Sequence, residues 1–174
     1  MSYKGRFKIT KPEKYIGDYT NVVYRSLWER NAFRWCDEAT SVKSWSSEEV
    51  VIPYYYEVDK KYHRYFMDLK IVLESGKTVL VEIKPFKETK PPTGNRRTKR
   101  YITEGFTYVK NQNKWEAAAE YAADRGWEAA RHAAGCGPAR VGLRQRHAQC
   151  VNRSRSLDLW AFAASLPHRC LLAC

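Results

Sequence analysis

Three charged residues near the middle of the chain have the types and spacing needed for hydrolysis. Asp68 interrupts an apolar and aromatic run, and Glu82 and Lys84 stand two positions apart near the end of a second run. Strand side chains alternate between faces, so Glu82 and Lys84 share a face, and antiparallel pairing of the runs brings Asp68 close to Glu82. Two adjacent carboxylates repel each other and need a cation, and Mg²⁺ is typically held by one or two carboxylates. We therefore expect Asp68 and Glu82 to bind Mg²⁺, with Mn²⁺ as a substitute ion.

Lys84 supplies the positive charge that such a site requires. A bound metal lowers the pKa of a water and shields an attacked phosphate, and a neighbouring lysine can orient that water or stabilise the transition state. The alternative is an ordinary exposed Glu–Lys pair on a solvent-facing sheet. Asp68 in the preceding run favours the catalytic interpretation.

Two strands and a turn position these residues. Aromatic and β-branched residues fill 62–73 and 78–84, and residues 74–77 between them contain Gly76, which can adopt a positive φ. Shorter strands are predicted at 42–45 and 50–58, and Pro53 in the latter indicates an edge or a bulge.

Two helices flank the predicted sheet. Apolar residues recur at three- and four-residue steps over 21–39, with Thr20 as a plausible N-cap. A second helix is predicted over 105–125, ended by Gly126. Glu29 lies beside the apolar stripe of the first helix, where it either joins the carboxylates or forms an (i, i+4) pair with Arg25.

Composition predicts one domain with an anionic partner. The 174 residues carry a net charge of +12 and are 44% hydrophobic, enough for a substantial core. A basic protein favours polyanions, and the alternative is that the charge only keeps the chain soluble. No apolar run approaches the roughly 20 residues of a membrane span, and the N-terminus lacks the apolar region of a secretory signal. We expect no membrane partner.

Basic residues gather in two further segments. Residues 1–19 read as a basic N-terminal arm with interleaved aromatics, suited to touching phosphates, to packing as a strap on the domain, or to both. Residues 86–100 read as a loop that either binds phosphates or is merely solvated. The expected phosphate contacts are Lys87, Lys90, Arg96, Arg97, Lys99 and Arg100, with Lys110 and Lys114 on the second helix.

Residues 128–174 differ in composition from the rest. No lysine follows Lys114, and this segment holds four of the five cysteines. A metal site is one interpretation, but the spacings match no C-x-x-C or H-x-x-x-H pattern. We interpret the segment as a foreign tail, translated out of frame or fused from other DNA. It shows no clear strand, only 157–166 could be helical, and residues after about 135 are expected to pack poorly.

The order of elements resembles the core of the PD-(D/E)xK nuclease superfamily, which implies an α/β (α+β), restriction-endonuclease-like fold with a central mixed sheet flanked by helices. Four stretches of residues 3–127 are similar to the head-completion nucleases of T-even-type tailed phages and to the N-terminal domain of TnsA-type endonucleases. They read YRSLWERNAFRWCD, SSEEVVIPY, HRYFMDLKI and VEIKPFKETKPP.

The resemblance implies a nuclease domain over 20–127 with catalytic residues Glu29, Asp68, Glu82 and Lys84. The carbonyl of Ile83 and the carboxylate of Glu29 would complete the metal shell. The implied function is that of a Mg²⁺-dependent DNA endonuclease in phage head completion or DNA packaging. It would act in the host cytoplasm during assembly or in the virion, with DNA and proteins of the phage head or neck as partners. The alternative is a non-catalytic head-completion or DNA-end-binding protein.

Overall fold

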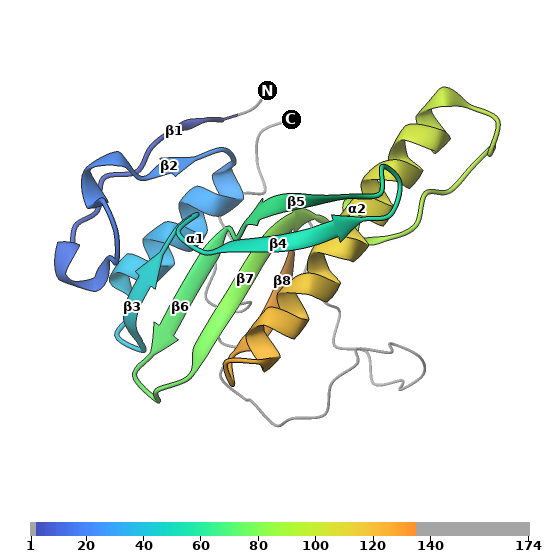
Figure 1. The fold of residues 1–174 in the computed structure, drawn as a ribbon. Helices are drawn as coiled ribbons and strands as arrows, with labels where there is room; N and C mark the ends of the chain where they lie inside the picture. Colours follow the sequence, from blue (N-terminus) through green and yellow to red (C-terminus); the bar gives the residue numbers. More distant parts are fainter. Residues whose placement is uncertain (1–2, 135–174) are drawn as a thin grey trace, which may run out of the picture. The chain divides into compact units, whose positions relative to one another are not determined.

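A four-stranded mixed sheet organises the computed structural model, which describes residues 3–134 (Figure 1). The strand order is β3 (Val42–Ser46), β6 (Leu69–Leu73), β7 (Thr78–Pro85) and β8 (Glu128–Ala134). β6 pairs antiparallel with both β3 and β7, and β8 runs parallel to β7. Residues 79–83 of β7 are all buried, as expected for a central strand covered on both faces. The structure is thus a mixed α/β fold in which β7 is central.

The β6–β7 hairpin matches the predicted turn. Gly76 has a φ of +82°, a conformation that costs glycine little, and its N–H donates to the carbonyl of Leu73 at 2.9 Å. The turn sets the register, in which Leu69 pairs with Val81 and Ile71 pairs with Val79. A local signal therefore determines which residues of the two strands face each other.

The single strand predicted over 62–73 is wrong, because the chain divides there into two strands in different sheets. β4 (Val51–Tyr56) and β5 (Lys61–Phe66) form a separate two-stranded ribbon, and β6 begins at Leu69. The break falls at Met67, whose N–H donates to Val50 and whose carbonyl accepts from Glu48. Both halves are rich in strand-forming residues, so periodicity carries no sign of the division.

The first helix, α1 (Leu27–Glu38), begins later than predicted. Residues before it form a 3-10 turn, η2 (Tyr19–Asn21), and a short strand, β2 (Val23–Tyr24), which pairs with β1 (Gly5–Arg6). The N-cap is Ser26, not Thr20, whose N–H and hydroxyl both donate to Asp18. Because Thr20 is bound to Asp18 in this turn, it does not cap the helix.

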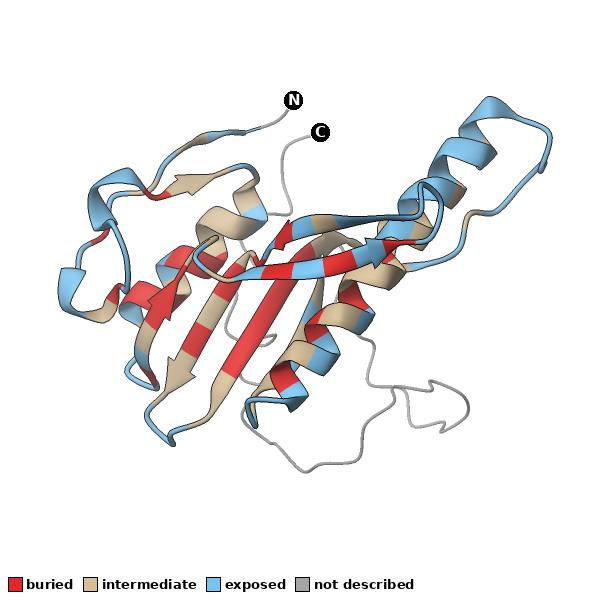
Figure 2. Cartoon of the chain, viewed as in Figure 1, coloured by how far each residue is buried: buried red, intermediate tan, exposed pale blue. Residues whose placement is uncertain are grey.

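The second helix, α2 (Lys99–Ala123), is longer than predicted and is capped by Thr98. Its first turns project beyond the sheet, and Figure 2 shows that burial is confined to the later turns (Figures 1 and 2). There Ala118 and Ala122 join a core with Ile52, Tyr54 and Leu80. The apolar residues of the early turns, Ile102 and Phe106, are exposed, and the apolar side on which the prediction rests begins only at Val109.

The N-terminal segment packs as a strap on the domain. Phe7 contacts Phe33 and Trp45, with ring centroids 5.7 and 6.2 Å apart. The buried carboxylate of Asp37 accepts hydrogen bonds from Thr10 and Lys11, among them one of 2.8 Å from the Thr10 N–H. Lys14, in the 3-10 turn η1 (Pro12–Lys14), donates to the carbonyl of Ala39 at 2.6 Å. The expected strap is confirmed, and the phosphate contacts of the arm stay a prediction.

The expectation that no strand follows Trp127 is wrong, because β8 extends the sheet. Every residue of β8 pairs with β7, from Glu128 with Val79 to Ala134 with Pro85. The alanine-rich segment lacks β-branched residues, but pairing with a central strand supplies order that propensity does not. The foreign origin of the tail stays a prediction, and the expectations for 135–174 lie outside the described residues. Among residues 3–134, no helix has the length and apolar character to cross a bilayer.

Candidate active site

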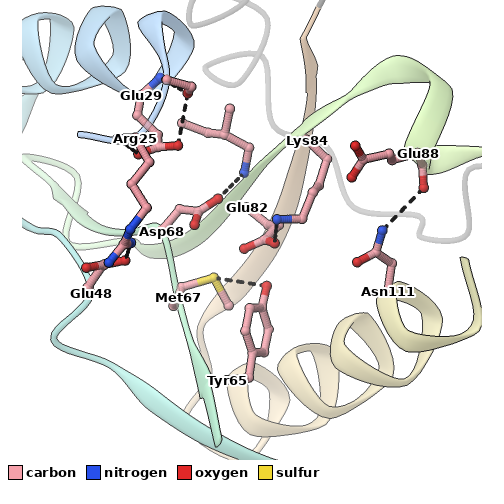
Figure 3. A network of polar contacts seen from close by, with 12 residues as sticks. Arg25, Glu29, Glu48, Tyr65, Met67, Asp68, Glu82, Lys84, Glu88 and Asn111 are labelled. Carbon is pink, nitrogen blue, oxygen red and sulfur yellow. Dashed lines mark hydrogen bonds and ion pairs between the residues drawn. The ribbon is translucent and has the colours of Figure 1, made fainter. Parts of the chain in front are cut away.

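The structure brings Asp68, Glu82 and Lys84 together where β6 stops pairing with β7 (Figure 3). The pairing ends at Leu69, the first residue of β6, which lies opposite Val81 of β7. Beyond this pair, the N–H of Ile83 faces the same side of β7 but has no residue of β6 to donate to. The side chain of Asp68 replaces the strand: its Oδ2 accepts from the Ile83 N–H at 2.7 Å. Lys84 Nζ lies 2.7 Å from Glu82 Oε1. The juxtaposition that the hairpin predicts is therefore present.

The negative charge of the buried Glu82 carboxylate is only partly compensated by neighbouring groups. Only 2% of the residue is exposed; the Lys84 ammonium lies 2.7 Å from Oε1 and the Tyr65 hydroxyl adjoins the carboxylate, but no other donor among residues 3–134 reaches its oxygens. Burial of a charge without full pairing is costly unless a further cation is present. Burial and the adjacent Glu82 carboxylate also raise the pKa of Tyr65. The position favours an additional positive charge.

Burial and the neighbouring negative charge also change the pKa of Asp68. Burial and the Glu82 carboxylate raise its pKa to about 7, against the opposing effects of Lys84 and the Ile83 N–H. Burial alone would lower the pKa of Lys84, but Glu82 and Asp68 raise it above its ordinary value. A carboxylate pair of this kind holds either a proton or a cation near neutral pH. Lys84 stays protonated and acts as a donor.

The donor set fits a hard divalent cation. Asp68 and Glu82 offer carboxylate oxygens, and the N–H and carbonyl of a strand residue point toward the same neighbouring strand. Since the Ile83 N–H points at Asp68, its carbonyl is directed to that same side. Among residues 3–134, no three His, Cys, Asp or Glu side chains gather closely enough to hold a metal by themselves. Mg²⁺ matches this set, because it keeps several waters and needs few protein ligands.

Glu29 has a local role that the sequence did not predict. Its carboxylate accepts from the Ser26 hydroxyl at 2.9 Å and from the Arg25 N–H at 2.7 Å, while its own N–H donates to Ser26. This reciprocal arrangement is a variant of the capping box, in which the Glu29 carboxylate accepts from the N–H of the residue before the N-cap. The guanidinium of Arg25 forms an ion pair with Glu48. The charge of Glu29 still reaches Asp68, where it adds to the rise in pKa. Its participation in the metal shell stays a prediction.

Two lysines of α2 lie against the rings of the β4–β5 ribbon. The ammonium of Lys114 is 4.9 Å from the ring centroid of Tyr65 and 5.8 Å from that of Tyr54, and Lys110 is 5.0 Å from that of Tyr56. Burial, and then the positive charge of Lys84, lower the pKa of Lys114. Lys114 is therefore a second cation close enough to act on the site.

Sequence patterns missed Asn111, which is buried and donates to the carbonyl of Glu88 at 3.5 Å (Figure 3). This contact ties α2 to the short 3-10 helix η3 (Phe86–Thr89) that follows β7. The only available signal was its position in the polar stretch between Lys110 and Lys114.

The other predicted DNA contacts lie along η3, the following segment and the start of α2. Lys90 stacks on Phe86 at 4.5 Å, and Arg100 pairs with Glu104 at 2.9 Å. Lys99 and Arg100 belong to the first turn of α2, so their assignment to the loop is wrong. A cavity of about 450 Å³ lies between these segments, lined among others by Lys87, Lys90 and Arg100. Arg96 and Arg97 are exposed.

Comparisons with known proteins agree on one family. The model of the family described as TnsA-like endonuclease N terminal matches residues 39–128, a range that contains Asp68, Glu82 and Lys84 but not Glu29. The head completion nuclease of Enterobacteria phage T4 is 39% identical over 131 residues, which cover 72% of this chain and 87% of that protein. No solved structure matches the chain.

Proposed function

The chain belongs to the family of TnsA-like endonucleases, and from this premise we propose that it hydrolyses phosphodiester bonds of DNA with the help of Mg²⁺. Its homologue in phage T4 is a head completion nuclease, so we assign the present protein to the same stage of phage assembly. It would act in the host cytoplasm or in the virion, beside proteins of the phage head or neck. Membership of an endonuclease family favours this function over a non-catalytic DNA-end-binding role.

The observation that carries the proposal is the incompletely paired carboxylate of Glu82 beside Asp68 and Lys84. Asp68, Glu82 and the carbonyl of Ile83 would hold the metal ion, and Glu29 would orient its outer shell. When bound, Mg²⁺ would lower the pKa of a water and shield the negative charge of the scissile phosphate. The raised pKa of Asp68 fits a group that exchanges a proton for a cation.

Lys84 acts as a donor in this mechanism. Because its pKa is raised, its ammonium holds the attacking water or neutralises charge on the phosphate, and does not remove a proton. Lys114 adds a second positive charge from α2, with its ammonium 4.9 Å from the centroid of the Tyr65 ring. The basic residues from Lys87 to Arg100 would hold phosphates on either side, where they position the strand without reading its sequence.

Nicking of supercoiled plasmid tests the proposal. The purified protein should nick DNA with Mg²⁺ or Mn²⁺ and not with EDTA. Asp68→Ala and Glu82→Ala should abolish nicking, whereas binding measured by gel shift in EDTA should remain close to wild type. Glu74→Ala is the matched control, because Glu74 is an exposed acid in the β6–β7 turn.

Two outcomes contradict the assignment. If Asp68→Ala or Glu82→Ala, purified free of host nucleases, nicks DNA at the wild-type rate, the site lies elsewhere. Equal nicking by the wild type in EDTA and in Mg²⁺ removes the metal from the mechanism.

A further inference from the structure

The β4–β5 ribbon has one face in the core and one face open to solvent. Ile52, Tyr54 and Tyr65 point inward against α2. The residues between them point outward, and we call this set the ribbon face. It consists of Val51, Pro53 and Tyr55 on β4 with Tyr62, Arg64 and Phe66 on β5. Figure 2 shows the resulting alternation of buried and exposed positions along β4.

The ribbon face is a ladder of cross-strand pairs. Tyr55 pairs with Tyr62, with ring centroids 5.3 Å apart, and Val51 pairs with Phe66. Between them Arg64 pairs with Pro53, and its guanidinium lies 5.7 Å from the Phe66 ring. Tyr62 is 77% exposed, and Phe66, Tyr55 and Val51 are 40–45% exposed. Aromatic and apolar area of this extent, gathered on one side of a ribbon, indicates a binding surface.

We propose that the ribbon face binds the unpaired bases of single-stranded DNA, an inference that rests on the proposed nuclease function and names its substrate class. Every base has a flat π-face, so exposed aromatic rings bind single strands by stacking, with arginine adding cation–π contacts. The bases of a duplex are stacked on each other and offer no free face to a flat ribbon. The enzyme therefore takes DNA that has a single-stranded stretch beside the bond to be cut.

The position of the ribbon connects this surface to the active site. Phe66, the last residue of β5, precedes Asp68 by two residues, which is about 7 Å along an extended chain. A strand stacked on the ribbon face and continuing past Phe66 would come close to the carboxylates.

Charge favours DNA over a protein partner at this surface. Within a chain of net charge +12, the ribbon carries Lys60, Lys61 and Arg64 against Glu57 and Asp59. Of the two acids at the tip, Asp59 already binds His63 at 2.7 Å and the Lys61 N–H at 3.1 Å. A polyanion meets little repulsion here, and Arg64 at the centre of the ladder gains a phosphate or a base as its partner.

Binding of fluorescent oligodeoxythymidine in EDTA tests the inference without any cleavage. Tyr55→Ala combined with Tyr62→Ala should weaken binding of the single strand at least about tenfold, the effect expected for the loss of one or two stacked bases. Binding of a blunt duplex should change by less than about twofold. Tyr62→Trp should retain single-strand affinity, since it keeps a stacking ring. Glu74→Ala is the control, because Glu74 is exposed in the β6–β7 turn, outside the ribbon and the basic segments.

The outcomes separate this inference from the proposed function. Single-strand affinity of the double variant equal to wild type overturns the inference, even when Mg²⁺-dependent nicking is intact. An equal loss of duplex and single-strand binding overturns it as well. A change in the oligomeric state of the double variant, measured by sedimentation, with oligonucleotide binding unaltered, shows that the surface joins protein chains instead. Selective single-strand binding in a protein that never cuts would refute the nuclease mechanism and support the ribbon face.

Discussion

Replacement of Asp68 by asparagine should stabilise the metal-free protein above neutral pH while it destroys cleavage. The reason lies in the raised pKa of Asp68, which burial and Glu82 bring from 3.8 to about 7. In that window the folded chain retains a proton that the unfolded chain has released. The free energy of unfolding therefore falls as pH rises through the window, and the stability present below pH 3.8 is lost above about pH 7. Asparagine mimics the protonated acid and avoids this loss.

The size of the effect follows from the width of the window. About three pH units at about 1.4 kcal/mol each give an upper limit of about 4 kcal/mol. Asp68 is only half-buried, and solvent and Lys84 screen its charge, so we expect about 1–2 kcal/mol. For a chain of this length, that corresponds to a Tm higher by about 3–6 °C.

Thermal unfolding in EDTA at pH 5 and pH 8 measures the effect. Asp68→Asn should exceed wild type in Tm at pH 8 and approach it at pH 5. Glu74→Gln should match wild type at both, because exposed substitutions rarely change stability by more than about 0.5 kcal/mol. With Mg²⁺ at about 100 times its Kd, wild type should gain about 2.7 kcal/mol, and Asp68→Asn much less.

Either of two results would refute this reasoning. A lower Tm of Asp68→Asn than of wild type at pH 8 in EDTA would mean that the Asp68 carboxylate stabilises the fold by accepting the Ile83 N–H. Equal stabilisation of both proteins by Mg²⁺ would mean that Asp68 does not bind the ion.

Three further predictions concern the basic residues and the start of α1. Lys114→Met should slow cleavage by about tenfold to a thousandfold through the loss of a charge near the phosphate, with Tm nearly unchanged; an unaltered single-turnover rate would confine Lys114 to packing. Ser26→Ala should lower the stability by about 1 kcal/mol because α1 loses its capping box, and an unchanged denaturant midpoint would contradict that role. Neutralising four exposed cations together should reduce the slope of log affinity against log salt by up to about 4, and an unchanged slope would show that they do not contact phosphates. These cations are Arg96, Arg97, Lys99 and Arg100.

The cluster of Asp68, Glu82 and Lys84 could be predicted from the sequence because it depends on signals that act over a few residues. A glycine turn between two runs of strand-forming residues determines the β6–β7 hairpin. Once that pairing exists, the alternation of side chains places Glu82 and Lys84 on one face of β7. The pairing itself brings Asp68, next to the end of β6, beside them. Turn chemistry and period-two patterning act over a few residues, so no knowledge of the rest of the fold is needed.

Other features depend on which distant segments meet. The division at Met67 arises because β5 packs on α2 while β6 pairs with β3, and both halves have the same strand character. β8 is ordered by parallel pairing with β7, although the whole of α2 separates the two strands in the sequence. An alanine-rich stretch gives no sign of such a contact. In each case tertiary contacts override local propensity.

The carboxylate pair, its lysine and the basic character that suits DNA could all be predicted from the residues alone. The packed fold was needed to show that Glu29 closes a capping box, that Lys114 stacks on Tyr65 near the carboxylates, and that the outer side of β4–β5 stays open. The difference lies in how far apart along the chain the interacting residues are. Spacing along one strand or turn predicts neighbours a few residues apart, whereas the face a helix or ribbon leaves uncovered depends on every element packed against it.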